Sequence, residues 1–233
     1  MSSTTPTSNS SGALSLGKAE FVRLMIEQDV LQFGDFTLKS GRQSPYFFNL
    51  GKVSDARGLA ALGRAYAQAL GDSGWQYSVL FGPAYKGIPI AAATGVALAD
   101  AGANPGVTYN RKEAKDHGEG GQLVGADIKD EQIVVIDDVL TAGTAVREAL
   151  ALIRANGGKL KGVLVALDRE ERVSENLADG SGVTAIGALA LELDVPVLSI
   201  VRLQDVIEYL DSEGSYPEAL EAILKYRTTY CVY

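Results

Sequence analysis

Short apolar runs alternate with Ala-rich helical stretches over most of the chain. Apolar runs that predict strands lie at residues 78–81, 107–109, 133–136, 162–167 and 197–201. Helical spacing predicts helices at residues 87–101, 144–155, 183–193, 203–210 and 217–225. Strand–helix alternation, with strands apolar on both faces, is typical of a parallel sheet buried between helices. We therefore predict an α/β fold with a mostly parallel central sheet flanked by helices.

The chain before the first of these strands follows a different pattern. Apolar residues at helical spacing predict a helix over 18–31, whereas the polar and aromatic segment 34–51 fits neither periodicity. Ser54 or Asp55 is expected to cap a second helix, which should end near Gly74. This part of the chain is therefore expected to cover the sheet rather than to belong to it.

We expect one folded domain with an N-terminal extension. Residues 1–17 are rich in serine and carry no charged side chain, so we predict a disordered tail there. Residues 18–233 are predicted to form a single domain, with a small N-terminal hood at about 18–70 and a core at about 71–233. The tail lacks the basic start and the apolar stretch of a secretory signal, which favours a cytoplasmic protein.

Composition excludes several classes of function. The 233 residues include one cysteine, Cys231, and one histidine, His117, which excludes a disulfide framework and any zinc motif with two imidazoles. The formal net charge of −8 disfavours binding to nucleic-acid phosphates. No apolar run approaches the roughly 18 residues of a membrane span. We therefore expect neither a nucleic-acid partner nor a membrane partner.

Two carboxylates and a loop of small residues follow the strand predicted at 133–136. Asp137 and Asp138 stand at the strand end, and the loop 141–145, T-A-G-T-A, opens the next helix. Backbone N–H groups and the helix dipole make such a loop a phosphate cradle. Because carboxylates repel phosphate, the two aspartates are expected to accept hydrogen bonds from sugar hydroxyls or to partner magnesium. An ordinary capped turn is the alternative interpretation of this run.

Cations follow two other predicted strands. The turn at 82–87, G-P-A-Y-K-G, carries Lys86 and suits a diphosphate, although a plain Gly-Pro turn with a surface lysine has the same pattern. The segment 110–121 gathers cations ahead of several glycines, which predicts a mobile loop that closes over a charged leaving group. A solvated charged hairpin is the alternative, because acidic residues nearly balance these cations. The cationic residues are Arg111, Lys112, Lys115 and His117.

A third group of residues fits a flat, acidic ring. Lys39 precedes the aromatic pair Phe47 and Phe48, and Arg169 stands at the end of the strand predicted at 162–167. An aromatic wall suits a planar base, and a ring carboxylate needs an Arg or Lys. Taken singly, these residues also fit core aromatics and a strand-end salt bridge.

The motif at 134–144, V-V-I-D-D-V-L-T-A-G-T, resembles the phosphoribosyl-pyrophosphate (PRPP) motif of the type I phosphoribosyltransferases. The resemblance implies that the Thr/Gly loop binds the sugar 5-phosphate and that Asp137 and Asp138 hold the ribose hydroxyls. It also implies that the turn at 82–87 meets the pyrophosphate, often through a strained peptide, here placed at Ala84–Tyr85. Together with Lys39 and Arg169, the pattern resembles the members of the family that use orotate.

By this resemblance, magnesium is the cofactor, held mainly through the PRPP diphosphate and without direct protein ligands. The residues implied to bind PRPP are Lys39, Tyr85, Lys86, Arg111, Lys112, Lys115, His117, Asp137, Asp138, Val139, Leu140, Thr141, Ala142, Gly143, Thr144 and Ala145. Those implied to surround orotate are Lys39, Phe47, Phe48, Thr141 and Arg169. Those implied to be catalytic are Lys115, His117, Asp137 and Asp138.

The implied reaction transfers the phosphoribosyl group of PRPP to orotate, giving orotidine 5′-monophosphate and pyrophosphate, as in UMP biosynthesis. A homodimer that shares the 110–121 loop across its interface is implied as well. One alternative is transfer to another nucleobase, which should not need Lys39 and Arg169 aimed at one carboxylate. A PRPP-sensing regulator is the other alternative, but it would favour a basic face that a net charge of −8 does not offer.

Overall fold

The computed structural model describes residues 16–38, 41–115, 121–140, 143–173 and 182–233. Its helices are α1 (Leu16–Glu27), α2 (Ala56–Ser73), α3 (Gly87–Asp100), α4 (Thr144–Ala155), α5 (Ala185–Leu193), α6 (Leu203–Glu213) and α7 (Pro217–Tyr230), with a short 3-10 helix η1 (Leu50–Lys52). Its strands are β1 (Leu31–Thr37), β2 (Gln43–Phe48), β3 (Val79–Gly82), β4 (Gly106–Lys115), β5 (Gly121–Gly125), β6 (Gln132–Ile136), β7 (Lys159–Asp168) and β8 (Val197–Arg202).

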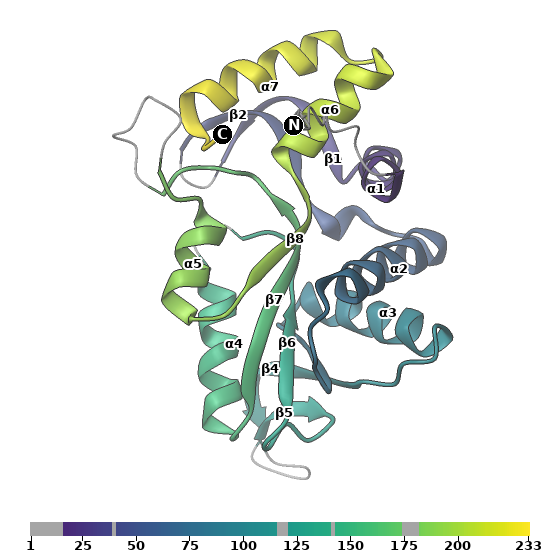
Figure 1. Cartoon of the computed structure of the whole chain (residues 1–233), viewed down its shortest axis with the longest axis vertical. Helices are drawn as coiled ribbons and strands as arrows, with labels where there is room; N and C mark the ends of the chain where they lie inside the picture. Colours follow the sequence, from purple (N-terminus) through teal and green to yellow (C-terminus); the bar gives the residue numbers. More distant parts are fainter. Residues whose placement is uncertain (1–15, 39–40, 116–120, 141–142, 174–181) are drawn as a thin grey trace, which may run out of the picture.

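A six-stranded sheet in the order β5-β4-β3-β6-β7-β8 forms the centre of the molecule. All neighbouring strands are parallel except β4 and β5, which are antiparallel. Helices α2 and α3 lie on one face of the sheet and α4 and α5 on the other (Figure 1). The prediction of an α/β fold with a mostly parallel sheet between helices is confirmed.

Alternation along the strands divides the interior into two apolar clusters. In β6, Val134 and Ile136 pack with residues of α2 and α3, whereas Ile133 and Val135 pack with residues of α4 and α5. All four side chains are fully buried, which explains why this strand shows no polar alternation. Each such side chain contributes about 1.5–3 kcal/mol to folding by leaving water.

The order of the strands creates a switch point between β3 and β6. The chain leaves β3 through α3 to β4 on one side, and it leaves β6 through α4 to β7 on the other. The connecting helices therefore lie on opposite faces of the sheet, and the loops that follow β3 and β6 diverge. Ligands of open α/β sheets bind in the crevice at such a point, beyond the carboxyl ends of the strands.

Helix α2 forms as its sequence predicts. The Asp55 side chain accepts a hydrogen bond from the Gly58 amide at 2.8 Å and caps the helix, and Gly74 ends it in the left-handed conformation with φ 65°. A Cβ built on Gly63 would lie 2.4 Å from the Ala93 carbonyl oxygen. Glycine therefore lets α2 and α3 pack closely on one face of the sheet.

The predicted helix over 18–31 is too long at its C-terminal end. Helix α1 ends at Glu27, and β1 and β2 form an antiparallel hairpin in the segment that showed no periodicity. The register shifts between Phe33 and Phe36, a bulge that interrupts the period-two pattern expected of a strand. The antiparallel edge strand β5 is also missing from the sequence-based prediction.

Elements from the first and last described parts of the chain meet at the carboxyl edge of the sheet. The hairpin lies beside α7, and α1 lies beside α6, at the same end of the molecule (Figure 1). Near the C-terminus, Cys231 forms an antiparallel bridge with Glu171, and the Val232 amide donates to the Glu170 carbonyl at 2.8 Å. The division into a hood and a core near residue 70 stays a prediction. None of the described helices combines the length and apolar character needed to cross a membrane.

Candidate functional site

Asp137 and Asp138 stand where β6 ends, at the switch point. Asp137 is 8% exposed, and its Oδ1 accepts a hydrogen bond from the Asp138 amide at 2.9 Å. Oδ1 of Asp138 accepts one from the Val139 amide at 2.8 Å. The buried hydroxyl of Tyr66 on α2 donates to the Asp137 carbonyl at 2.8 Å. The backbone of the turn therefore holds both carboxylates at the edge of the sheet.

The two aspartates differ in their electrostatic surroundings. Burial, followed by the negative charge of Asp138, raises the pKa of Asp137 from 3.8 to about 6. The Asp138 amide and the Lys86 ammonium act in the opposite direction, without cancelling these effects. Above pH 6 the buried carboxyl group of Asp137 is therefore charged. A hydrogen-bond donor such as a sugar hydroxyl would stabilise that charged form.

Lys86 connects the end of β3 to the end of β6. Its Nζ lies 2.7 Å from Oδ2 of Asp138, while about half of the lysine side chain is exposed. A Cβ on Gly87 would lie 2.8 Å from the Ile136 carbonyl oxygen, so glycine is needed for the turn to approach β6. The peptide bond between Ala84 and Tyr85 in this turn is cis. A cation and two carboxylates thus face the same crevice.

The end of β4 adds two cations. Asn110 Oδ1 accepts a hydrogen bond from the Ala84 amide at 2.9 Å and ties this strand to the turn after β3. Lys112 places its Nζ 4.8 Å from the ring centroid of Tyr85, which is 67% exposed. A guanidinium nitrogen of Arg111, Nη1, is buried without a hydrogen-bond partner among the described residues.

Part of the predicted cationic loop lies outside the described residues. The backbone of β4 continues to Lys115, which pairs with Gly121 of the antiparallel strand β5. The side chain of Lys115 and the whole of His117 lie outside the described part. Their predicted contacts with the leaving group stay predictions.

The loop after the two aspartates leads into α4. Gly143 precedes the helix with φ 68°, and among the described residues no side chain caps the helix N-terminus at Thr144. Exposed amides at a helix N-terminus attract anions, as the phosphate interpretation requires. The Leu140 side chain belongs to the apolar cluster under α4, so only its backbone is available to a ligand. Val139 packs against the other cluster, Thr144 and Ala145 are exposed, and Thr141 and Ala142 lie outside the described residues.

Arg169 lies at the end of β7, against the hairpin. It is 9% exposed, its Nη2 donates to Ser44 Oγ at 3.2 Å, and its Cζ lies 4.4 Å from the ring centroid of Tyr46. Its Nε donates to Glu171 Oε1 at 2.6 Å. The structure thus brings Arg169 to the aromatic segment, as predicted, whereas Lys39 lies outside the described residues.

Phe47 and Phe48 do not form one aromatic wall. Because strand residues alternate between faces, Phe48 is buried in the core, while Phe47 is 37% exposed and stacks on Phe36 with ring centroids 5.5 Å apart. The two side chains therefore lie on opposite faces of β2, and their predicted contact with a base stays a prediction. Tyr46, two residues before Phe48 on the same face, contacts Arg169 instead.

Sequence reasoning missed several residues that hold these groups in place. Ser44 and Tyr46 lie inside the aromatic segment that drew attention, but only the strand alternation shows which face they occupy. Asn110 and Glu171 are adjacent to predicted residues, and Tyr66 and Tyr226 lie on helices far away in sequence. No local signal in the chain indicates the contacts of the last two.

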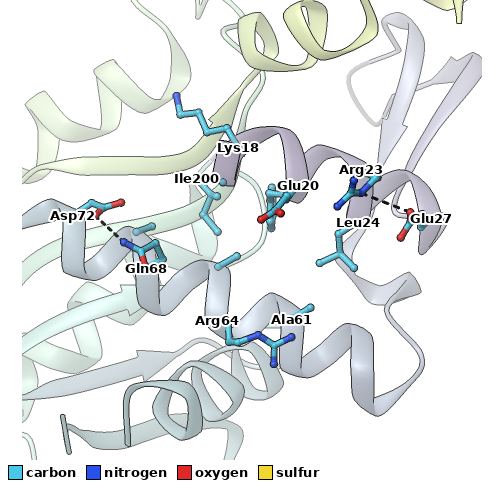
Figure 2. A pocket seen from close by; sticks show the side chains of 14 residues that line it. Lys18, Glu20, Arg23, Leu24, Glu27, Ala61, Arg64, Gln68, Asp72 and Ile200 are labelled. Carbon is cyan, nitrogen blue, oxygen red and sulfur yellow. Dashed lines mark hydrogen bonds and ion pairs between the residues drawn. The ribbon is translucent and has the colours of Figure 1, made fainter. Parts of the chain in front are cut away.

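Two cavities of the described structure lie away from this site. One of about 730 Å³ lies between α1 and α2, with Lys18, Glu20 and Arg64 among its lining residues (Figure 2). The other, of about 480 Å³, lies between the hairpin and the start of α7. Neither is lined by a predicted site residue.

The donor set of the site fits magnesium only in part. Carboxylate oxygens at Asp137 and Asp138 are ligands of the kind that magnesium prefers. Asp138 is nevertheless already paired with Lys86, and no group of three metal-ligating side chains occurs among the described residues. A magnesium ion here would therefore take most of its ligands from a bound diphosphate and water.

Comparison with known proteins gives a consistent result. The family model of the phosphoribosyl transferase domain matches residues 51–184. The chain is 52% identical over 212 residues to an orotate phosphoribosyltransferase of Aliivibrio fischeri and 53% identical to that of Vibrio parahaemolyticus, in both cases covering 91% of this chain and 96% of the relative. The crystal structure of the Francisella tularensis orotate phosphoribosyltransferase is 36% identical, with a TM-score of 0.79 over 91% of this chain and 99% of that one.

The range that the domain model matches includes the aspartate pair and the turn that carries Lys86. The chain belongs to the orotate phosphoribosyltransferases of the type I phosphoribosyltransferase family.

Proposed function

We propose that this chain transfers the 5-phosphoribosyl group of PRPP to N1 of orotate, which gives orotidine 5′-monophosphate and pyrophosphate. The observation that carries the site assignment is the ion pair of Lys86 and Asp138, 2.7 Å apart across the switch point. It puts a cation for a diphosphate next to acceptors for a sugar diol. The loop after these aspartates leads to the N-terminus of α4, where no described side chain forms a cap and where the 5-phosphate can bind.

Asp137 and Asp138 orient the ribose. Each carboxylate keeps an oxygen that is not engaged by the amide of its own turn, and a hydroxyl can donate to that oxygen. Fixing the sugar in this way places its anomeric carbon between the diphosphate and the base. Such positioning replaces a large part of the entropy cost of bringing two reactants together.

Cations stabilise the leaving group. Lys86, Arg111 and Lys112 come from the ends of β3 and β4, and the Ala84–Asn110 hydrogen bond holds these ends together. As the bond to the anomeric carbon breaks, negative charge develops on the diphosphate and positive charge on the sugar. Positioned cations favour that separation, and each well-placed donor contributes about 3–4 kcal/mol. We assign Lys115 and His117 to the same task, His117 as a proton donor or a hydrogen-bond donor.

Magnesium completes the donor site in this proposal. When bound to the diphosphate, it supplies additional positive charge to the leaving group. The residues nearest to it would be Asp137 and Asp138, which act mainly through water and the substrate. The N1 proton of orotate leaves to solvent as the new bond to the anomeric carbon forms, and we assign no residue as its base.

Arg169 recognises the acceptor base. Its guanidinium plane is oriented by Ser44, Tyr46 and Glu171 beside the hairpin, where it can meet the ring carboxylate of orotate. Lys39 and Thr141 complete the proposed base site, together with the backbone near Phe47 and Phe48. A nucleobase without a carboxylate would offer Arg169 no anion beyond Glu171, with which it is already paired.

We further propose that the protein is a homodimer in which the 110–121 loop reaches the partner's site. Helix α3 supports this, because residues 87–99 carry no charge and Val96 is 64% exposed. Pro89, Ala92 and Ala99 are exposed on the same helix. A charge-free exposed helix face fits burial against a second copy. Val96→Glu should then give a monomer in analytical ultracentrifugation, whereas Val173→Glu, at a similarly exposed position, should not.

One assay tests the reaction. Orotate absorbance should fall when PRPP and magnesium are added, and it should stay constant when the metal is omitted. Uracil and the purine bases, offered in place of orotate, should not be consumed at a comparable rate. Equal or faster turnover of another base would show that the acceptor is wrongly assigned, while the donor assignment would stand.

A further inference from the structure

A cluster of side chains around Glu171 lies beside Arg169, at the proposed base site. Glu171 Oε1 accepts hydrogen bonds from Arg169 Nε and from the Tyr226 hydroxyl, both at 2.6 Å. Its Oε2 accepts one from Arg42 Nη1 at 3.1 Å. These partners come from three segments: the end of β7, the loop of the hairpin and helix α7. Glu171 therefore joins parts of the chain that are far apart in sequence.

The orientation of Arg169 depends on this cluster. A guanidinium carries its five N–H donors in one rigid plane, so its recognition of a carboxylate is sensitive to rotation. Tyr46 lies against the face of that plane, and Ser44 accepts from Nη2. The bond from Nε to Glu171 fixes the remaining rotation about the side chain. The plane that meets the ligand is thus set before the ligand arrives.

Glu171 is itself held more firmly than a surface carboxylate. Its residue bridges to Cys231, and the Arg172 amide donates to the Tyr230 carbonyl at 2.9 Å. The Arg42 guanidinium, which reaches Glu171 from the hairpin, also lies 4.6 Å from the ring centroid of Tyr230. The neighbouring Glu170 does not share this role, because its carboxylate accepts from the Gln204 amide at 2.9 Å.

We propose that Glu171, held by Tyr226 of the C-terminal helix, is the positioning residue that orients Arg169 toward the carboxylate of the acceptor base. This inference rests on the proposed function, in which Arg169 meets that carboxylate. It assigns a task to α7, which lies outside the part of the chain that the domain model matches. It also explains why the end of the chain packs against the end of β7.

The test separates binding of the base from every other step. Glu171→Gln keeps the size of the side chain but removes its charge and one acceptor oxygen, so the hydrogen bonds that fix the Arg169 plane are weakened. We expect the KM for orotate to rise by roughly 10-fold, with the KM for PRPP and kcat changed by less than about twofold. Tyr226→Phe should raise the KM for orotate by about threefold, since Arg42 and Arg169 still hold the carboxylate.

A double variant shows whether Glu171 acts through Arg169. If it does, Arg169→Ala together with Glu171→Gln should raise the KM for orotate no further than Arg169→Ala alone, because coupled residues are not additive. Glu27→Gln, which breaks an exposed Arg–Glu pair on α1, is the matched control and should change neither KM. Thermal unfolding of each variant separates a loss of folded protein from a loss of base binding.

The contrary outcomes are distinct. An unchanged KM for orotate in both Glu171→Gln and Tyr226→Phe, while Arg169→Ala raises it, overturns the role of Glu171 alone. Additive effects in the double variant also overturn it, since they show that Glu171 acts independently of Arg169. Equal increases in both KM values overturn it as well, since they indicate a general loss of structure. An unchanged KM for orotate in Arg169→Ala overturns the base site of the proposed function and this inference with it.

Discussion

The two halves of the site are held in different ways. On the donor side, Asp137 and Asp138 are fixed by amides of their own turn, and Lys86 remains half exposed. On the base side, Arg169 is buried and held by side chains from β2 and from its own strand end. The donor side is therefore local and open, as a site that admits a large charged substrate must be. The base side is a preorganised side-chain cluster, which suits discrimination between rings.

The largest effect is expected on the donor side. Asp138→Ala removes an acceptor for the ribose and leaves the Lys86 ammonium without its carboxylate. Two charged hydrogen bonds at about 1.5–3 kcal/mol each correspond to a fall in kcat/KM for PRPP of roughly 100-fold or more. The KM for orotate should stay nearly constant, as steady-state kinetics with each substrate varied would show. A fall shared equally by both substrates would contradict the division of the site.

On the base side we expect the opposite pattern, with a change in orotate binding and little change in PRPP binding. Arg169→Ala should raise the KM for orotate by roughly 30-fold, because the ring carboxylate loses a charged hydrogen-bond partner worth about 2 kcal/mol. The KM for PRPP should change little. A competitive assay with orotate and uracil measures the same effect as lost discrimination. If Arg169→Ala instead weakened PRPP alone, the guanidinium would belong to the donor side.

The pH dependence of folding stability tests the buried charge of Asp137 on the donor side. Its pKa of about 6 in the folded chain exceeds the ordinary 3.8, so the folded state binds the extra proton between these values. Stability from this group is therefore greatest near pH 4 and is lost as pH rises through 6. At pH 7 the buried charge should cost about 3 kcal/mol relative to pH 4, by the worth of two pKa units.

Denaturant unfolding of wild type and Asp137→Asn at several pH values measures this cost. The variant should gain in stability relative to wild type between pH 4 and pH 7, while its kcat/KM for PRPP falls. In the wild type, kcat/KM for PRPP should decrease below pH 6, because a protonated Asp137 accepts sugar hydroxyls poorly. A stability difference that is flat across this range would contradict the buried charge.

The smallest effect is expected at Tyr66, which supports the backbone of the aspartate turn. Tyr66→Phe removes the hydroxyl that donates to the Asp137 carbonyl and should lower the free energy of unfolding by about 1 kcal/mol. Tyr77→Phe, a tyrosine without such a bond among the described residues, is a suitable control. Equal losses of stability in the two variants would show that the hydroxyl of Tyr66 contributes nothing of its own.

The same contrast explains what could be predicted from the sequence. The aspartate pair follows one apolar strand, and Lys86 lies in the turn after another. Because the carboxyl ends of parallel strands meet at one edge of the sheet, the sequence alone predicts that these side chains lie close together. The hairpin at 31–48 was not predicted, because its bulge breaks the strand period and its buried face depends on α7. Without the strand assignment, the sequence does not show that the pleat of β2 turns the side chains of Phe47 and Phe48 to opposite faces. Glu171 gained its task only from contacts with a helix more than 50 residues later.

The central claim is that the ribose-phosphate donor and the base bind to separately held halves of one crevice. Calorimetric titration of PRPP with magnesium into the wild type, Asp138→Ala and Arg169→Ala tests it directly, without turnover. The account predicts that Asp138→Ala loses most of its PRPP affinity while Arg169→Ala keeps it within about twofold. Weak binding by Arg169→Ala, or unchanged binding by Asp138→Ala, would contradict it.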